Sequence, residues 1–402
     1  MNFFNKLYCR GFQFCFKIAL PFLPYRKPKI YESNENIKDI LAEAKVDSVL
    51  IVTSKSLSKS FAMEDIKNIL DNKKIRYEIY DNCMPNPTIE CVEQAKELYL
   101  SNDLQAIIAF GGGSAMDLAK IVGARVVRPN KSVSKMKGLL KIRKKLPPLI
   151  AIPTTAGTGS EVTIAAVITD EKTHHKYPIN DFNLVYHYAV LDYKNTISLP
   201  KSITATTGMD ALTHAVEAFI SKTRTKETKK MSLEATKLIV ENLKECYDNP
   251  TNHIARKNML YASYCAGVAF TKAYVGYVHA IAHSLGGKYN IAHGLANAVI
   301  LPIVLEEYGK RIYKRIKELA VYCDLANKED SPKDATYKFI DWIYNINLQM
   351  NIPYSLNMIE EKDIKELSHI ASKEANPLYP VPKLLSAREL EKIYYILKNK
   401  ER

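Results

Sequence analysis

The sequence predicts a two-part protein, an amino-terminal α/β domain built on a parallel sheet followed by an all-α domain. Three observations predict this fold class. The chain of 402 residues is long enough for roughly two domains of ordinary size. Up to about residue 198, short apolar runs alternate with amphipathic helical patterns, which is typical of a parallel sheet with helices on both faces. Beyond that point, helical patterns dominate. We therefore expect a leader (1–28), an α/β domain (29–198) and a helical domain (199–402).

The helices and strands of the α/β domain are predicted from local periodicity and from the residues that begin or end each element. Apolar runs rich in β-branched residues predict strands, and amphipathic runs between them predict helices, the second entered through "PNPT". A β-rich segment follows the strand that precedes "PTTAGTGSE". The expected strands are 47–54, 75–81, 104–110, 165–170 and 188–193, and the expected helices are 60–73, 88–101 and the segment after the glycines at 111–113.

In the second domain, long stretches carry the 3.6-residue period of helices. The last of them opens with Ser386 and Glu389 in the spacing of a capping box, in which each side chain binds the other's backbone N–H. The expected helices include 231–248, 258–274, 311–326 and 386–400.

Composition places limits on the function. With 47% hydrophobic and 25% charged residues the chain has a globular balance, and no segment reaches the ~18 uncharged apolar residues of a membrane span. The apolar stretch 12–24 contains Lys17 and no cleavage site, so we expect it to pack on the domain or to lie at a surface. Seven scattered cysteines without a CxxC pair indicate a cytoplasmic protein without a disulfide framework.

The net charge of +14 could indicate a polyanionic partner, but no nucleic-acid motif accompanies it. The densest basic run, residues 135–145, is expected to be a solvated loop or helix face. We therefore expect no nucleic-acid partner.

Two loops predict a nucleotide site. "GGGSAMDLAK" places three glycines between a strand and a helix, where free backbone N–H groups can bind a pyrophosphate. The alternative is a tight turn without a ligand, and the stretch does not match GxGxxG. "PTTAGTGSE" (153–161) supplies hydroxyls and two glycines after another strand, so the pair is typical of the two walls of a nucleotide cleft.

A cluster of histidines predicts a metal site. Asp210 and His214 in "MDALTH" share one helix face, and His279 and His283 have the same i, i+4 spacing on a helix that Gly286 and Gly287 are expected to end. With the histidine of "AHG" they offer one carboxylate and up to four imidazoles, a set suited to divalent iron or zinc.

Simpler readings stay open for these residues. Asp210 follows Thr207 by three positions and could be a first-turn carboxylate of an N-cap pattern. A lone histidine is more often a packing or surface residue than a ligand. Spacing alone does not decide which of the three later histidines bind metal.

From about residue 45 to its carboxyl end, the chain resembles the iron-containing (group III) alcohol dehydrogenases. The shared motifs, in order, are "PNPT", "GGGSAMDLAK", "IPTTAGTGSEVT", "TATTGMDALTHAVEAF" and "HAIAHSLGGKYNIAHG". The resemblance implies a dehydroquinate synthase-like fold, with a Rossmann-like dinucleotide-binding domain and a helical metal-binding domain. It also implies a homodimer acting on a small alcohol or aldehyde.

The resemblance assigns roles residue by residue. The four metal ligands fall on Asp210, His214, His279 and His293, and His283 corresponds to a histidine near the nicotinamide, our candidate for relaying the alcohol proton. The implied cofactor contacts are Gly111, Gly112, Gly113, Ser114, Asp117, Thr154, Thr155, Ser160 and Lys176.

One departure from the family concerns the choice of cofactor. Where many members that prefer NAD end the strand with aspartate, this chain has Ser54 followed by Lys55. An aspartate would bind the adenosine ribose and repel a 2′-phosphate, whereas serine and lysine tolerate or attract it. We therefore expect Ser54 to contact NADP(H), with NAD(H) as a second possibility. Ser54 could also be only a turn residue.

The expected activity is metal-dependent hydride transfer between NAD(P)(H) and a primary alcohol or aldehyde of the butanol or lactaldehyde type. Iron is the expected metal and zinc fits the same ligands. Two related activities remain as alternatives, a glycerol or polyol dehydrogenase and a dehydroquinate synthase-like lyase.

Overall fold

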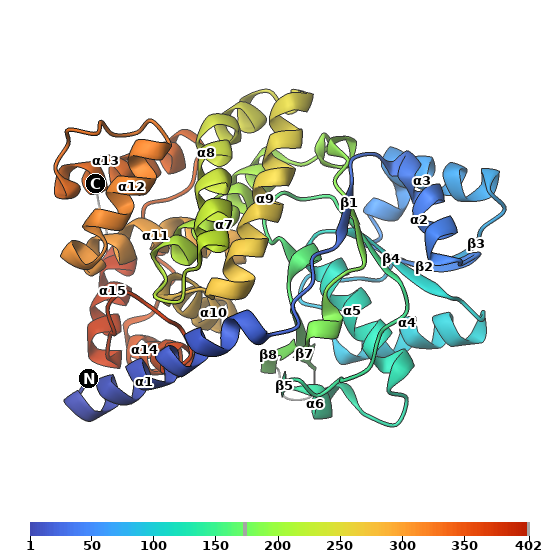
Figure 1. The fold of residues 1–402 in the computed structure, drawn as a ribbon, viewed down its shortest axis with the longest axis horizontal. Helices are drawn as coiled ribbons and strands as arrows, with labels where there is room; N and C mark the ends of the chain where they lie inside the picture. The colour runs from blue at the N-terminus through green and yellow to red at the C-terminus, as the bar shows by residue number, and fades with distance from the viewer. Residues whose placement is uncertain (172–174, 400–402) are drawn as a thin grey trace. The chain divides into compact units, whose positions relative to one another are not determined.

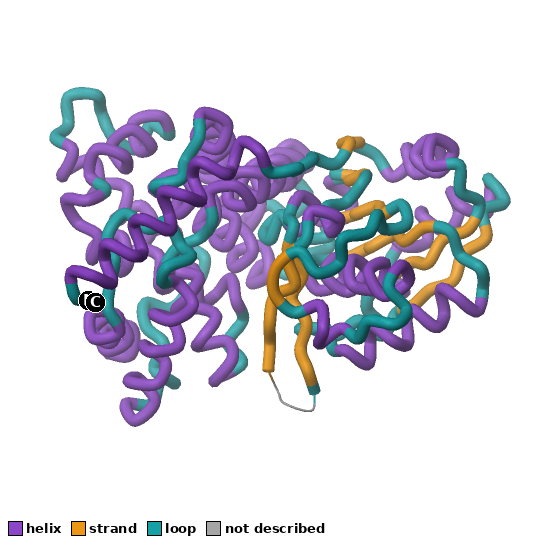
Figure 2. Tube along the Cα trace, turned by 60° about the horizontal axis from the view of Figure 1, so that its bottom comes forward, coloured by secondary structure: helices purple, strands orange, loops and turns teal. Residues whose placement is uncertain are grey.

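The computed structural model describes residues 1–171 and 175–399 and divides into two compact units. One unit spans Pro24–Leu199, and the other combines Met1–Leu23 with Pro200–Arg402 (Figure 1). Among the described residues every strand belongs to the first unit, as the orange segments of Figure 2 show. The predicted fold class, a parallel α/β part and an all-α part, is therefore confirmed.

The α/β unit is built on a six-stranded sheet in which every neighbouring pair of strands is parallel. The strand order is β1-β9-β6-β4-β2-β3. From β1 to β6 the consecutive strands of this sheet are joined through α-helices, as the alternating pattern predicted, whereas β6 and β9 are joined through two strands of a second sheet. The strands are β1 Lys29–Tyr31, β2 Ser48–Val52, β3 Arg76–Tyr80, β4 Ala106–Gly111, β6 Leu149–Pro153 and β9 Tyr188–Val190. The helices are α2 Ile37–Ala44, α3 Phe61–Asn72, α4 Ile89–Ser101, α5 Gly113–Val127 and α6 Val133–Met136.

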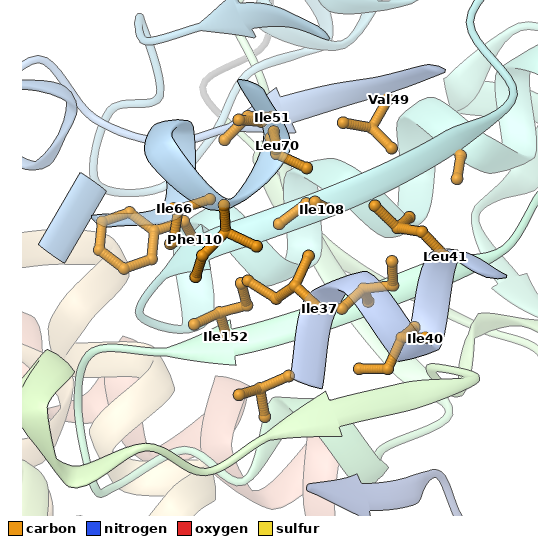
Figure 3. Close-up of a cluster of buried hydrophobic side chains, with 14 of the residues drawn as sticks. Ile37, Ile40, Leu41, Val49, Ile51, Ile66, Leu70, Ile108, Phe110 and Ile152 are labelled. Carbon is orange, nitrogen blue, oxygen red and sulfur yellow. The ribbon is translucent and has the colours of Figure 1, made fainter. Parts of the chain in front are cut away.

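Helices cover both faces of this sheet because its central strands are apolar on both sides. On one face, Val49 and Ile51 of β2 are fully buried against α2 and α3 (Figure 3). On the other face, a Cβ at Gly123 of α5 would lie 3.5 Å from Leu149 and 3.7 Å from Ile107. Each fully buried aliphatic side chain contributes about 2 kcal/mol.

A smaller sheet accompanies the first. β7 (Ala165–Asp170) pairs antiparallel with β8 (His175–Asn180), and β8 pairs parallel with β5 (Gly138–Leu139). This is the β-rich segment expected after "PTTAGTGSE". The basic run 135–145 passes through β5 and the following loop with all its lysines and arginines exposed, which confirms that it is solvated.

In the second unit, every regular element among the described residues is a helix. The capping box of α15 is confirmed, since Ser386 N donates to Glu389 Oε2 at 2.8 Å and Glu389 N to Ser386 Oγ at 3.3 Å. No helix among the described residues is both long and apolar enough to cross a membrane. The helices are α1 Phe3–Ala19, α7 Lys201–Ile220, α8 Lys226–Asp248, α9 His253–Ala273, α10 Tyr277–Tyr289, α11 His293–Tyr308, α12 Tyr313–Tyr322, α13 Pro332–Gln349, α14 Glu361–Ala375 and α15 Ala387–Asn399.

The expected end of α10 at Gly286 and Gly287 is wrong. The helix continues through both glycines to Tyr289 and is ended by Asn290, which has φ 53° and ψ 33°. Asparagine tolerates this left-handed conformation and its N–H bonds to Gly286 O, so the glycines are not needed as the stop signal.

Candidate metal and cofactor sites

The first element of the candidate metal site is the middle of α7. Because α7 begins at Lys201, Asp210 lies in its third turn, and the reading of Asp210 as a first-turn N-cap carboxylate is wrong. Asp210 and His214 are 2% and 5% exposed. A buried carboxylate needs a cation or several donors to offset its lost hydration, so this position favours a ligand over a surface role.

Two histidines from other helices join Asp210. His279 of α10 places Nε2 at 4.0 Å from Asp210 Oδ1, and His293, the first residue of α11, places Nε2 at 3.5 Å from the same oxygen. One ligand atom from each of the three residues lies within 4.8 Å of the others. A carboxylate oxygen with two imidazole nitrogens is a donor set that divalent iron and zinc accept, so the residues fit the metal that the sequence predicted.

His214 stands beside this group rather than within it. Its ring stacks on His279 with centroids 4.5 Å apart and, at 4.0 Å and 12°, on Phe270. The structure therefore brings three of the four predicted ligands together and places the fourth, the imidazole of His214, against the ring of His279.

Glu217 fixes the orientation of His279, and sequence reasoning did not single it out. Its Oε2 lies 2.7 Å from His279 Nδ1 and accepts from Gly276 N at 2.7 Å, while Oε1 accepts from Val278 N at 2.9 Å. Burial raises the pKa of the Glu217 carboxyl to about 7, against the lowering effect of these backbone donors. Burial also holds the pKa of His279 well below its usual value, so the imidazole is neutral and its Nε2 carries a lone pair that can bind a metal.

Asn297 is a second residue that sequence reasoning missed. It lies one turn beyond His293 on α11 and is fully buried. Its Nδ2 donates to Asp210 Oδ1 at 2.7 Å and lies 3.1 Å from His293 Nε2 and 3.4 Å from His279 Nε2. The amide hydrogens thus lie close to lone pairs of the Asp210 oxygen and of the two imidazole nitrogens. A cation bound by these three atoms would occupy the same place.

His283 is separate from the three-residue group but adjacent to it. Its ring stacks on His293 with centroids 5.2 Å apart, and its Nδ1 lies 2.7 Å from Glu374 Oε1. Tyr379 donates to the same oxygen at 2.7 Å. With its side chain 42% exposed, His283 is held in place at a position that solvent reaches.

In the α/β unit, the two loops predicted to bind nucleotide lie against each other. β4 ends at Gly111 and α5 begins at Gly113, so the backbone N–H groups of the first turn of α5 have no side-chain cap. A Cβ at Gly112 would lie 3.2 Å from Thr155 Oγ1, and one at Gly113 2.9 Å from Thr158 Cγ2. The glycines therefore permit a close approach of the loops at the carboxyl ends of β4 and β6, where Ser114, Thr154 and Thr155 also lie.

Asp117 and Ser160, both predicted cofactor contacts, bind each other. Ser160 Oγ donates to Asp117 Oδ1 at 2.9 Å, and Val167 N donates to Oδ2 at 2.9 Å. Lys120, which sequence reasoning missed, is fully buried and donates to Ser160 Oγ, to the backbone and hydroxyl oxygens of Thr163 and to Ala165 O, at 2.7–3.2 Å. The cluster holds the second loop on α5.

The two remaining predicted contacts lie at the edges of this region. Ser54 follows β2, where its hydroxyl accepts from Leu57 N at 3.4 Å. Lys176 of β8 donates to Asn86 Oδ1 of the "PNPT" loop at 2.7 Å.

Comparison with known proteins decides the family. The profile of the iron-containing alcohol dehydrogenases matches residues 28–193, and that of the carboxyl-terminal part of the Fe-containing alcohol dehydrogenase family matches residues 204–397. The chain belongs to the iron-containing alcohol dehydrogenase family.

Relatives in this family align along most of the chain. It is 37% identical to alcohol dehydrogenase 4 of Schizosaccharomyces pombe over 83% of this chain and 79% of the relative. It is 33% identical to the NADPH-dependent butanol dehydrogenase of Clostridium saccharobutylicum over 82% of this chain and 84% of the relative. The crystal structure of a 1,3-propanediol oxidoreductase superposes with a TM-score of 0.88 at 32% identity, covering 92% of this chain and 97% of that one.

Proposed function

We propose that this alcohol dehydrogenase is an iron-dependent, NADP(H)-preferring enzyme that interconverts primary alcohols and aldehydes of the butanol or lactaldehyde type. The convergence of Asp210, His279 and His293 within 4.8 Å carries the metal part of the proposal. His214, stacked on His279, is the fourth ligand in this proposal. Similarity to enzymes named for butanol and 1,3-propanediol supports a small alcohol as substrate.

Residues of the chain have separate roles in this reaction. Held by these ligands, the metal would act as a Lewis acid, which lowers the pKa of an alcohol or polarises a carbonyl. Glu217 holds the His279 imidazole in the tautomer that exposes Nε2. His283, held by Glu374 and open to solvent, relays the alcohol proton or orients the nicotinamide.

The cofactor part of the proposal rests on the α/β unit. The uncapped first turn of α5, with Gly111, Gly112, Gly113 and Ser114, binds the pyrophosphate. The loop of Thr154 and Thr155 forms the facing wall. Asp117 and Ser160 support this loop through Lys120, and Lys176 orders the "PNPT" loop beside it.

The direct experiment measures aldehyde-dependent oxidation of NADPH and NADH by protein purified without oxygen and loaded with ferrous iron. Butanal and lactaldehyde are the substrates, and glycerol oxidation tests the polyol alternative. Turnover with NADPH that a chelator removes and ferrous iron restores is expected. Turnover with glycerol alone would favour the polyol dehydrogenase, and phosphate release without net cofactor change would favour the lyase.

Ser54→Asp tests the cofactor preference. The new carboxylate is expected to lower kcat/KM for NADPH by roughly 10-fold or more, because like charges repel at close range, and to lower kcat/KM for NADH less or to raise it. Ser101→Asp, which adds the same charge at the exposed end of α4, serves as the control. An unchanged ratio of kcat/KM values in Ser54→Asp would remove Ser54 from the cofactor site.

Glu217→Gln tests the orientation of His279. One carboxylate oxygen becomes an amide group that meets the backbone N–H donors of Gly276 or Val278, so His279 loses its fixed geometry. Metal affinity is expected to fall about 10–100-fold, measured by competition with a chromophoric chelator. Excess ferrous iron should restore part of the activity. Glu366→Gln, on the exposed side of α14, should change neither quantity, and an unchanged metal affinity in Glu217→Gln would contradict the role of Glu217.

A further inference from the structure

Helix α1 packs on the helical unit through polar contacts and an aromatic contact, in which the rings of Phe16 and Tyr274 lie edge to face with centroids 5.0 Å apart. Arg10 donates to Val381 O at 2.7 Å and to Pro382 O at 3.1 Å, and Gln13 donates to Pro377 O and Tyr379 O at 3.1 and 2.8 Å. Only Cys9 and Gln13 of α1 are buried. The inner face of the helix is therefore held by side-chain donors on backbone carbonyls together with the ring of Phe16.

The outer face of α1 is apolar along its whole length. Its side chains recur at helical spacing, and no charged residue interrupts them. This is the reverse of an ordinary surface helix, which buries its apolar stripe and exposes its polar one. The exposed fractions are 72% for Phe3, 78% for Phe4, 60% for Leu7, 64% for Tyr8, 39% for Phe12, 63% for Phe14 and 55% for Ile18, with Phe22 at 84% just beyond the helix.

Positive charge borders this face. The first acidic residue of the chain is Glu32, and the whole chain carries a net charge of +14. Lys6 and Lys17 lie along one flank of α1, because their spacing places them on one edge of the helix. Arg10 lies between them but turns its guanidinium inward to Val381 O and Pro382 O. The six basic residues that precede Glu32 are Lys6, Arg10, Lys17, Arg26, Lys27 and Lys29.

We propose that α1 binds an anionic lipid surface, with its outer apolar side chains entering the headgroup boundary and its basic flank contacting the lipid phosphates. A helix that exposes aromatic and aliphatic residues beside lysines and lacks acidic groups has the chemistry of an interfacial helix. Charge selects this occupant. Pairing of this face with the same face of a second copy would bring two identical lysine flanks together, and their like charges oppose that pairing.

Co-sedimentation of the full-length protein with vesicles tests the proposal. Binding to vesicles rich in phosphatidylglycerol is expected to exceed binding to phosphatidylcholine vesicles by about 10-fold or more and to weaken with salt. The triple variant Phe4→Ser, Leu7→Ser, Phe14→Ser should lose this binding while Arg10 and Gln13 keep α1 in place.

The matched control removes equally exposed apolar side chains elsewhere. Phe61, Ile254 and Met358 are 94%, 62% and 49% exposed and lie outside α1, so their replacement by serine should leave vesicle binding unchanged. A second variant, Lys6→Glu with Lys17→Glu, keeps the apolar face and should lose binding to anionic vesicles selectively.

Three results would overturn the proposal. The first is no binding of the wild-type protein to anionic vesicles. The second is equal binding by the wild-type protein and the triple serine variant. The third is a wild-type dimer in sedimentation equilibrium that the triple variant dissociates, because this would identify a second copy as the occupant.

Discussion

The His279→Ala protein is expected to retain almost no iron and to lose aldehyde reduction by roughly 1,000-fold or more. The substitution removes a nitrogen that lies with the Asp210 and His293 donor atoms inside 4.8 Å, and it leaves the buried Glu217 carboxyl without its imidazole partner. A loss of this size corresponds to about 4 kcal/mol of transition-state stabilisation, a reasonable share for a Lewis acid. Iron content after desalting and kcat/KM for butanal are the two measurements.

The control for this variant is His253→Ala, which removes an exposed imidazole at the start of α9 in the same unit. Iron content and kcat/KM should both match the wild-type values. Aldehyde reduction at wild-type rate by a metal-free His279→Ala protein would remove His279 from the metal site and with it the proposed mechanism. Retained iron with lost activity would instead assign His279 to the substrate.

Local signals in the sequence predicted most of the fold. The strands β2 and β4 are continuous apolar runs, and the helices between the strands have a period of 3.6 residues. Both signals depend only on neighbours in the chain. The capping box of Ser386 and Glu389 was predictable for the same reason, because both residues lie within one turn. The end of α10 was not, since glycines in a helix cost about 1 kcal/mol each and packing outweighs that cost.

The residues of the candidate site also divide into those that local spacing predicts and those whose roles depend on contacts between helices. Asp210 and His214 were visible as an i, i+4 pair, and Glu217 follows at i+7 on the same face of α7, a signal that could have been used. Asn297 likewise stands four residues after His293. Their roles could not be read from the sequence, because each acts on residues from another helix.

Lys120 is the clearest case of a residue whose role only the structure shows. Its spacing on α5 predicts an ordinary helical lysine, yet its four acceptors lie 40 to 45 positions further along the chain. Burial lowers the pKa of Lys120 to about 8, so the ammonium group is still the main form at pH 7 and needs these acceptors. Asp117 adds an opposite charge beside it.

Lys120→Met is therefore expected to destabilise the α/β unit by about 3–5 kcal/mol. The variant keeps the length of the side chain but removes the positive charge with the larger effect of the two, Lys120 and Lys176, that compensate the partly buried Asp117. It also leaves the loop oxygens of Ser160, Thr163 and Ala165 without their donor. For a unit of this size the thermal midpoint should fall by on the order of 10 °C. Differential scanning calorimetry measures the midpoint, and titration with NADPH measures the affinity.

The control variant is Lys67→Met, which removes a lysine of α3 whose ion pair with Glu64 lies at the surface. Such pairs contribute about 1 kcal/mol or less, so its midpoint should stay close to that of the wild type. NADPH affinity should fall only in Lys120→Met, because Lys120 holds the loop that carries Thr154 and Thr155 against α5. If the two variants unfolded at the same temperature, the contacts of Lys120 would stabilise the protein no more than a surface ion pair does. The second loop would then be held in place by its close approach to Gly112 and Gly113 instead.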